Sequence, residues 1–202
     1  MKQFMKKRWP DILCAFVLIA AVVLLLVRCG SDPASGEPTL TVTTPQKLSI
    51  SDTEEFTLDV TINHLGEARY PAMSMSIAFD SSRLEFLGVE EGNVFILSDA
   101  NSTGQQLPTW SCNVKNSNDT GMINIMYLDM TGGKNAFTGE LLAQDDNVVL
   151  RLKFRLRGSV RPGDVLDLIV EDAVFAASDE TQSLAMTTDT LKVKNGRLVI
   201  GE

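Results

Sequence analysis

The residues that could do catalytic or metal chemistry are few and scattered. The chain of 202 residues has one histidine, His64, and no nucleophile motif such as GxSxG accompanies it. The three cysteines, at positions 14, 29 and 112, lack the CxxC spacing of a zinc site. Adjacent acids such as Glu90 and Glu91 fall on predicted turns, whereas glycoside hydrolysis needs two carboxylates that converge across a cleft. We therefore predict that the protein is not an enzyme and holds no metal or cofactor of its own.

Charge is divided unevenly along the chain. Residues 1–29 hold five cations and one acid, a net +4, so a total of −8 leaves −12 for residues 30–202. Nucleic-acid binding needs lysine and arginine side chains that replace the counterions of the phosphates. The acidic body argues against a nucleic-acid partner.

The N-terminal segment is typical of a membrane anchor. Residues 12–27 carry no charge and would form a helix of about 24 Å, which Arg8 and Arg28 at its ends lengthen by snorkelling. More cations precede the span than follow it, which predicts a cytoplasmic N-terminus. We therefore expect a basic tail (1–11), a transmembrane anchor (12–28), a flexible spacer (29–38) and a folded domain (39–202). A cleaved signal sequence, or an anchor lipid-modified at Cys29, remains open, and each of the three exports the body.

The body alternates apolar and polar residues from end to end, which is the pattern of half-buried β-strands. Clear examples are residues 56–62, 73–79, 123–127, 148–156 and 166–170. Near the end, Asn195-Gly196 between alternating segments predicts a hairpin with a type I′ turn. No segment after the anchor has a sustained helical period. About nine strands are therefore expected in two packed antiparallel sheets, a sandwich or jelly roll.

Several of these strands resemble cohesin domains in their order and spacing. The matching segments are EFTLDVTI (55–62), MSIAFD (75–80), LEFLGV (84–89), GMINIMYLD (121–129) followed by TGG (131–133), LRLKFRL (150–156) and the closing NGRLVI (195–200). Each segment alone is weak, because any sandwich alternates. Together they cover most of residues 39–202.

The resemblance implies an all-β, nine-stranded antiparallel jelly-roll sandwich that binds dockerin modules without catalysis. Calcium would belong to the dockerin and not to this chain. Some cohesins carry Asn and Asp where Ala72 and Ser74 stand here, so those hydrogen bonds to a dockerin would be missing. The outward residues of the docking sheet would be Ala72, Ser74, Ser76, Ser111, Asn113, Asn124, Met126, Leu128, Asp167 and Ile169.

Two further features have structural interpretations. A cationic strand, with Arg151, Lys153, Arg155 and Arg157 on one face, is interpreted as a solvated ladder with acids of neighbouring strands, such as Asp59 and Glu85. Asp80, at a strand end, is expected to cap the turn that follows it, Ser81-Ser82, and not to bind a metal.

The sequence thus predicts a single-pass membrane protein whose cohesin-like domain faces outside the cytoplasm or lies at the cell surface. It would tether dockerin-bearing secreted proteins, polysaccharide-degrading enzymes above all. One alternative is a carbohydrate-binding module that stacks sugars or polysaccharide on exposed aromatic side chains. Trp110 and Tyr127 fall in the inward register, which leaves Tyr70 and Phe95 as candidates. The other alternative is a structural subunit of a cell-envelope or secretion assembly.

Overall fold

The computed structural model describes residues 36–45, 48–49, 55–94, 110–130, 132–133, 135–139, 147–179, 183–186 and 190–201. All of them belong to one compact unit, Pro33–Glu202. In these ranges no helix has the length and apolar character needed to span a bilayer. The predicted anchor, Cys14, Cys29 and Phe95 lie outside the described residues.

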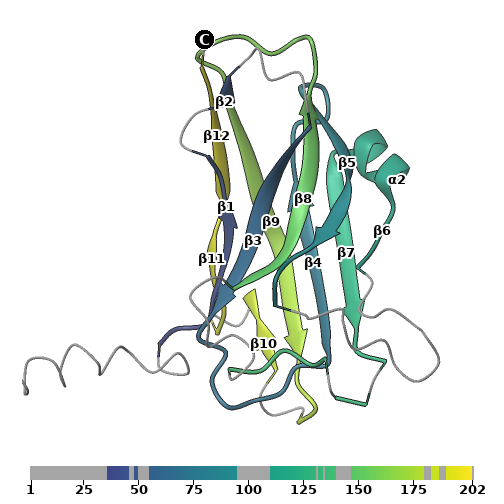
Figure 1. The fold of residues 1–202 in the computed structure, drawn as a ribbon, viewed down its shortest axis with the longest axis vertical. Helices are drawn as coiled ribbons and strands as arrows, with labels where there is room; N and C mark the ends of the chain where they lie inside the picture. Colours follow the sequence, from purple (N-terminus) through teal and green to yellow (C-terminus); the bar gives the residue numbers. More distant parts are fainter. Residues whose placement is uncertain are drawn as a thin grey trace, which may run out of the picture. The chain divides into compact units, whose positions relative to one another are not determined.

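The first sheet has five strands, which lie in the order β11-β1-β3-β8-β5. Their bounds are β11 (Lys192–Lys194), β1 (Thr39–Thr43), β3 (Phe56–Asn63), β8 (Val148–Leu156) and β5 (Leu84–Glu91). β1 lies between β3, with which it pairs antiparallel, and β11, with which it pairs parallel. The alternating segments 56–62 and 148–156 thus become neighbouring strands, as Figure 1 shows.

The second sheet follows the order β2-β12-β9-β4-β7-β6, with β10 paired to β9. Its strands are β2 (Leu48–Ser49), β12 (Gly196–Gly201), β9 (Val165–Ala176), β4 (Ala72–Ala78), β7 (Met122–Leu128), β6 (Ser111–Cys112) and β10 (Leu184–Ala185). Together the two sheets form a mostly-β sandwich (Figure 1). The expected all-β sandwich is therefore confirmed, but the sheets are not purely antiparallel, because β1 pairs parallel with β11 and β12 pairs parallel with β2.

Apolar side chains from the inner faces of both sheets form the core between them. Leu58, Val60 and Ile62 of β3 are buried, while the alternating polar residues of that strand are more exposed. Phe154 of β8 packs against Phe86 of β5 with ring centroids 5.5 Å apart. Burial of aromatic and branched side chains is the main stabilising contribution in such a sandwich.

The described residues form twelve strands, where about nine were expected, and three of the twelve are only two residues long. They also form one helix, α2 (Val114–Thr120), although the sequence predicted none after the anchor. With seven residues, or about two helical turns, α2 is too short to show a helical period in the sequence. The helix is fixed by its caps: the Asn113 side chain accepts a hydrogen bond from Asn116 N, and Gly121 ends the helix in the left-handed region at φ 70°.

The predicted hairpin at Asn195-Gly196 is wrong. β11 belongs to the first sheet and β12 to the second, so the chain crosses between the sheets at this point. Neither residue has the positive φ that a type I′ turn needs. Gly196 is required for another reason, because a Cβ there would lie 2.8 Å from Val42 Cγ1. The Asn195 side chain accepts a hydrogen bond from Val170 N, 2.9 Å away.

Three of the four expected cations of β8 lie in a ladder of ion pairs on the outer face of the first sheet. The fourth, Arg157, follows the strand, and its Nε donates to Leu84 O at 3.3 Å. Arg151 pairs with Asp59 at 3.2 Å, and Arg155 lies 3.5 Å from Glu85. Lys153 donates to Glu55 at 2.5 Å and thereby lowers the pKa of that carboxyl. These three cations are neutralised within the sheet, which leaves this face without a strong charge of one sign.

The expected turn cap at Asp80 is also confirmed. Its Oδ1 accepts hydrogen bonds from the backbone N of Ser82 at 3.0 Å and from the Ser82 hydroxyl at 2.5 Å. Its Oδ2 pairs with Arg83 Nε at 2.6 Å. Asp80 is therefore fully engaged in shaping the turn that leads into β5.

Candidate functional site

The sequence-predicted site residues all lie on the outer side of the second sheet or at its edge. β4 and β7 bring six of them into three directly opposed pairs: Ala72 with Leu128, Ser74 with Met126, and Ser76 with Asn124. We call these six residues the β4–β7 face. Met126 and Leu128 are 59% and 55% exposed, unusually high values for large apolar side chains.

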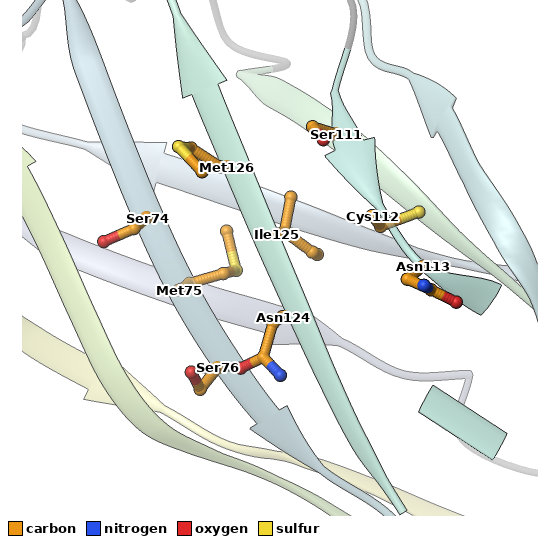
Figure 2. A pocket seen from close by; sticks show the side chains of 9 residues that line it. All are labelled: Ser74, Met75, Ser76, Ser111, Cys112, Asn113, Asn124, Ile125 and Met126. Atoms are coloured by element: carbon orange, nitrogen blue, oxygen red, sulfur yellow. Dashed lines mark hydrogen bonds between the residues drawn. The ribbon is translucent and has the colours of Figure 1, made fainter. Parts of the chain in front are cut away.

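One side of this face is hollowed toward β6 and the start of α2. This hollow, which we name the polar hollow for the serine and asparagine side chains in its lining, has a volume of about 480 Å³. Figure 2 shows its lining, which is formed by Ser74, Met75, Ser76, Ser111, Cys112, Asn113, Asn124, Ile125 and Met126. Six of the ten predicted site residues are therefore brought together around a single depression.

A second, apolar hollow of about 210 Å³ lies toward β9. It is lined by Ala72, Met73, Ser74, Met126, Tyr127, Leu128, Val174 and Ala176. The sequence reading missed Val174 and Ala176, which stand opposite Ser74 and Ala72 across the β4–β9 pairing. The small Ala and Ser side chains keep the floor shallow, so that another chain can approach closely.

A bulge in β9 explains why the sequence pattern did not indicate Val174 and Ala176. The register of the β4–β9 pairing shifts between Ser76 and Ile77, so Glu171 and Asp172 are both exposed and the alternation changes phase. The signal was present in the sequence: Leu166, Leu168 and Val170 are inward, and the inward series resumes one residue late at Ala173. Two adjacent acids at the break mark the bulge.

Asp167 and Ile169 are exposed on β9 but line neither hollow. Ile169 stands opposite Ala78, at the far end of β4, and Asp167 stands opposite Arg197 of β12. The structure thus separates these two predicted residues from the other eight.

Hydrogen bonds orient the polar side chains of the polar hollow. The Ser76 hydroxyl donates to Asn124 Oδ1 at 2.8 Å, which leaves the amide nitrogen of Asn124 as the group available for a partner (Figure 2). Asn113 Oδ1 accepts from Asn116 N at 3.0 Å. Asn113 therefore serves first as the N-cap of α2, and its place in the hollow is fixed by that role.

The charges near the β4–β7 face are predominantly acidic. β4, β6 and β7 contain no charged residue. Beside them, β9 exposes Asp167, Glu171 and Asp172, while Arg197 of β12 is opposite Asp167. A partner with cations above Glu171 and Asp172 would therefore be favoured electrostatically.

Of the two aromatic candidates for sugar stacking, Phe95 lies outside the described residues and Tyr70 is not available on the surface. Tyr70, expected to be exposed, is 2% exposed and packs edge-on against Phe175. Tyr127 points inward as expected, and its hydroxyl donates to Asn135 O at 2.6 Å. Burial raises the pKa of Tyr127, which keeps its phenol protonated.

Reactive chemistry is equally sparse in the part of the chain that the structure describes. No group of three or more His, Cys, Asp or Glu side chains in it could hold a metal ion. Cys112 is half-buried, and this burial raises the pKa of its thiol. The arrangement offers an exposed sheet surface with two shallow hollows, which suits binding of another macromolecule.

Known proteins share this sandwich architecture. A family model described as cohesin domain matches residues 39–194. The sixth cohesin of scaffoldin B from Acetivibrio cellulolyticus, solved in complex with a Cel5 dockerin mutant, superposes with a TM-score of 0.59 at 15% identity, covering 82% of this chain and 99% of that one. No curated protein matches the sequence.

Two further cohesins extend the comparison. The OlpA cohesin of Clostridium thermocellum, solved in complex with dockerin Doc918, has a TM-score of 0.58 at 16% identity, covering 82% of this chain and 99% of that one. A non-cellulosomal cohesin of the archaeon Archaeoglobus fulgidus has a TM-score of 0.52 at 14% identity, with coverage of 83% and 93%. The solved structures share the fold, and the family model spans most of the described sandwich. This chain therefore belongs to the cohesin domain family.

Proposed function

We propose that this chain is a dockerin-binding module that uses the β4–β7 face and its two hollows as the docking surface. In the same proposal, residues 12–28 anchor it in the membrane with the N-terminus in the cytoplasm. The folded domain would then tether secreted dockerin-bearing enzymes, with polysaccharide-degrading enzymes as the expected class, outside the cytoplasm or at the cell surface.

The observation that carries the proposal is the exposed β4–β7 face in a chain of the cohesin family. Met126 and Leu128 are large, apolar and mostly exposed, and the opposed Ser74 and Ala72 are small. Two of the similar cohesins were solved in complexes with dockerins. A sheet face of this composition suits an amphipathic helix, because small side chains allow close approach and large apolar ones supply area to bury.

Binding would proceed without covalent chemistry. A stable complex of this kind buries roughly 1,200 to 2,000 Å² in total. Met126 and Leu128 would supply the apolar anchors, while Asn124, held by Ser76, would donate its amide hydrogens to the partner. Calcium would be held by the dockerin.

The acids of β9 give the proposal an electrostatic component. Glu171 and Asp172 are both exposed beside the face, so a dockerin with lysine or arginine at the matching position would associate faster. Because exposed charges are screened by salt, the association rate should fall as the ionic strength rises.

Capture from secreted bacterial protein tests the binding function. The full chain, immobilised in detergent micelles, should retain a dockerin-bearing protein in calcium and release it in EGTA, while its own melting temperature stays unchanged. Ser74→Arg and Asn124→Arg should each abolish capture, because each places a long cation over a hollow. Thr43→Arg, at an exposed position on β1 of the other sheet, is the matched control and should capture normally.

Two results would contradict the proposal. Normal capture by both arginine variants of the β4–β7 face would show that the partner binds elsewhere. Retention by polysaccharide alone, with no dockerin-bearing protein, would favour the carbohydrate-binding alternative.

The anchor is tested separately. The full chain should stay with membranes after carbonate extraction, and external protease should digest the domain of intact cells. Deletion of residues 12–28 should leave the chain inside the cell, because this segment is proposed to direct export as well as anchoring. Release of the full chain by carbonate would exclude the transmembrane interpretation.

A further inference from the structure

Met126 is the methionine at which the two hollows of the β4–β7 face meet. It lines both of them and is 59% exposed. On β7 it stands opposite Ser74 of β4 and Ser111 of β6. Figure 2 shows its side chain extending from β7 toward Ser74. Any helix that covers both hollows must cover this thioether.

Three other methionines, on or near the same sheet, differ from Met126 in exposure or in position. Met73 and Met75 of β4 point into the core and are only 2% exposed. Met130 lies two residues beyond the end of β7 and is 71% exposed, but it lines neither hollow. A solvent-borne reagent can therefore reach Met126 and Met130 and is excluded from Met73 and Met75. Of these four methionines, Met126 alone is both exposed and part of the docking surface.

We propose that Met126 is an oxidation site whose modification switches partner binding off, an inference that rests on the proposed function. The oxidant is a hydroperoxide, with hydrogen peroxide as the simplest member. The sulfur lone pair attacks one peroxide oxygen and the O–O bond breaks. The sulfur keeps that oxygen as a sulfoxide after its proton passes to the other oxygen, which leaves as water from hydrogen peroxide or as an alcohol from an organic hydroperoxide. Sulfur is oxidised by two electrons and the peroxide is reduced by two.

The sulfoxide changes what the hollows offer to a partner. A flexible apolar side chain becomes polar, and its new oxygen is a hydrogen-bond acceptor that must be desolvated when a helix covers it. Most residues that line the apolar hollow with Met126, such as Ala72, Leu128 and Ala176, have no side-chain donor. If the sulfoxide oxygen instead accepts a hydrogen bond from the hydroxyl of Ser74 or Ser111, that hydroxyl can no longer donate to the partner. Both outcomes weaken docking, by roughly 10- to 100-fold for one unsatisfied polar group.

The experiment uses the full chain in detergent micelles, treated with hydrogen peroxide that is then removed with catalase. Peptide mapping by mass spectrometry follows the gain of one oxygen atom at each methionine. Titration calorimetry against a panel of calcium-loaded recombinant dockerins gives Kd before and after treatment. Each of the variants Met126→Leu and Met130→Leu is compared with itself, so the measured quantity is the change caused by the oxidant.

Met126 and Met130 should gain oxygen well before Met73 and Met75. Kd should rise about 10- to 100-fold for the wild type and for Met130→Leu, stay unchanged for Met126→Leu, and return after treatment with methionine sulfoxide reductase. An equal loss of affinity in Met126→Leu, or an unchanged Kd in wild type whose Met126 is oxidised, would overturn the switch alone. If the untreated chain binds no dockerin of the panel, the proposed function fails and the switch fails with it.

Discussion

The side chain of Asn118 joins α2 to the edge of the first sheet, and its replacement by alanine should destabilise the domain measurably. Asn118 Oδ1 accepts a hydrogen bond from Phe86 N at 2.9 Å, and Nδ2 donates to Phe86 O at 2.7 Å and to Val114 O at 3.0 Å. Phe86 is on β5, an edge strand of the five-stranded sheet, and the carboxamide takes the place of a further strand. Three hydrogen bonds therefore depend on one side chain.

The magnitude follows from those three bonds. A typical hydrogen bond contributes about 1 kcal/mol net, and a buried backbone group left unpaired costs about 1 to 3 kcal/mol. Because the side chain of Phe86 is buried, water has limited access to its backbone. Asn118→Ala should therefore lower the free energy of unfolding by about 2 to 4 kcal/mol.

Urea unfolding followed by far-UV circular dichroism measures this change. Asn116→Ala is the matched control on the same helix, with an exposed side chain, and should stay within about 0.5 kcal/mol of wild type. Asn118→Asp keeps the shape but turns a donor into a charged acceptor facing two carbonyl groups, so it should destabilise at least as much at pH 7. A loss below about 1 kcal/mol in Asn118→Ala would refute the account of α2 as an edge cover.

Three further predictions concern the rest of the sandwich. Gly196→Val should lower the free energy of unfolding by about 1 to 3 kcal/mol, because its Cβ would lie 2.8 Å from a β1 side chain; an unchanged urea midpoint would contradict this close approach. Hydrogen bonds from Ser82 and then Arg83 lower the pKa of Asp80, so the stability they add is present above its unfolded-state pKa and is lost as the pH falls through the lower folded value. Asp80→Asn should therefore show a shallower loss of stability than wild type in urea titrations across the acid range, and identical slopes would argue against it. Lys153→Met should leave the urea midpoint unchanged within error at low and high salt, because exposed ion pairs contribute little to the free energy of unfolding. A large, salt-dependent fall in the midpoint would show that the ladder stabilises the fold.

Alternation was sufficient to predict the longer strands, because each of them has one face in the core, whereas strands of two residues are too short to show it. The inward positions of β3 and β8 follow directly from the spacing of Leu58, Val60, Leu150 and Leu152. Pairing between strands distant in sequence was not deducible in this way. Asn195-Gly196 illustrates the limit: the same dipeptide serves a tight turn or, as here, a crossing where only glycine fits between two sheets.

The candidate site was predictable where strands keep a constant phase. On β4 and β7 the outward residues Ser74, Asn124 and Met126 follow from strict alternation, and they line the polar hollow. On β9 the bulge at Glu171 and Asp172 changes the phase, so the residues that reach the apolar hollow lie further along the strand than a regular register predicts. A helix of two turns such as α2 is defined by its caps, which a periodicity search does not weigh.

The position of β1 bears on how the domain would respond to mechanical load. Five residue pairs join β1 to β3 and three join it to β11, so the strand is held along both edges. A pull on the N-terminus along the strand axis would strain these bonds together in shear, and none could open ahead of the others. If the N-terminus were held in a membrane, as proposed, drag on a docked enzyme would load this doubly paired strand in shear.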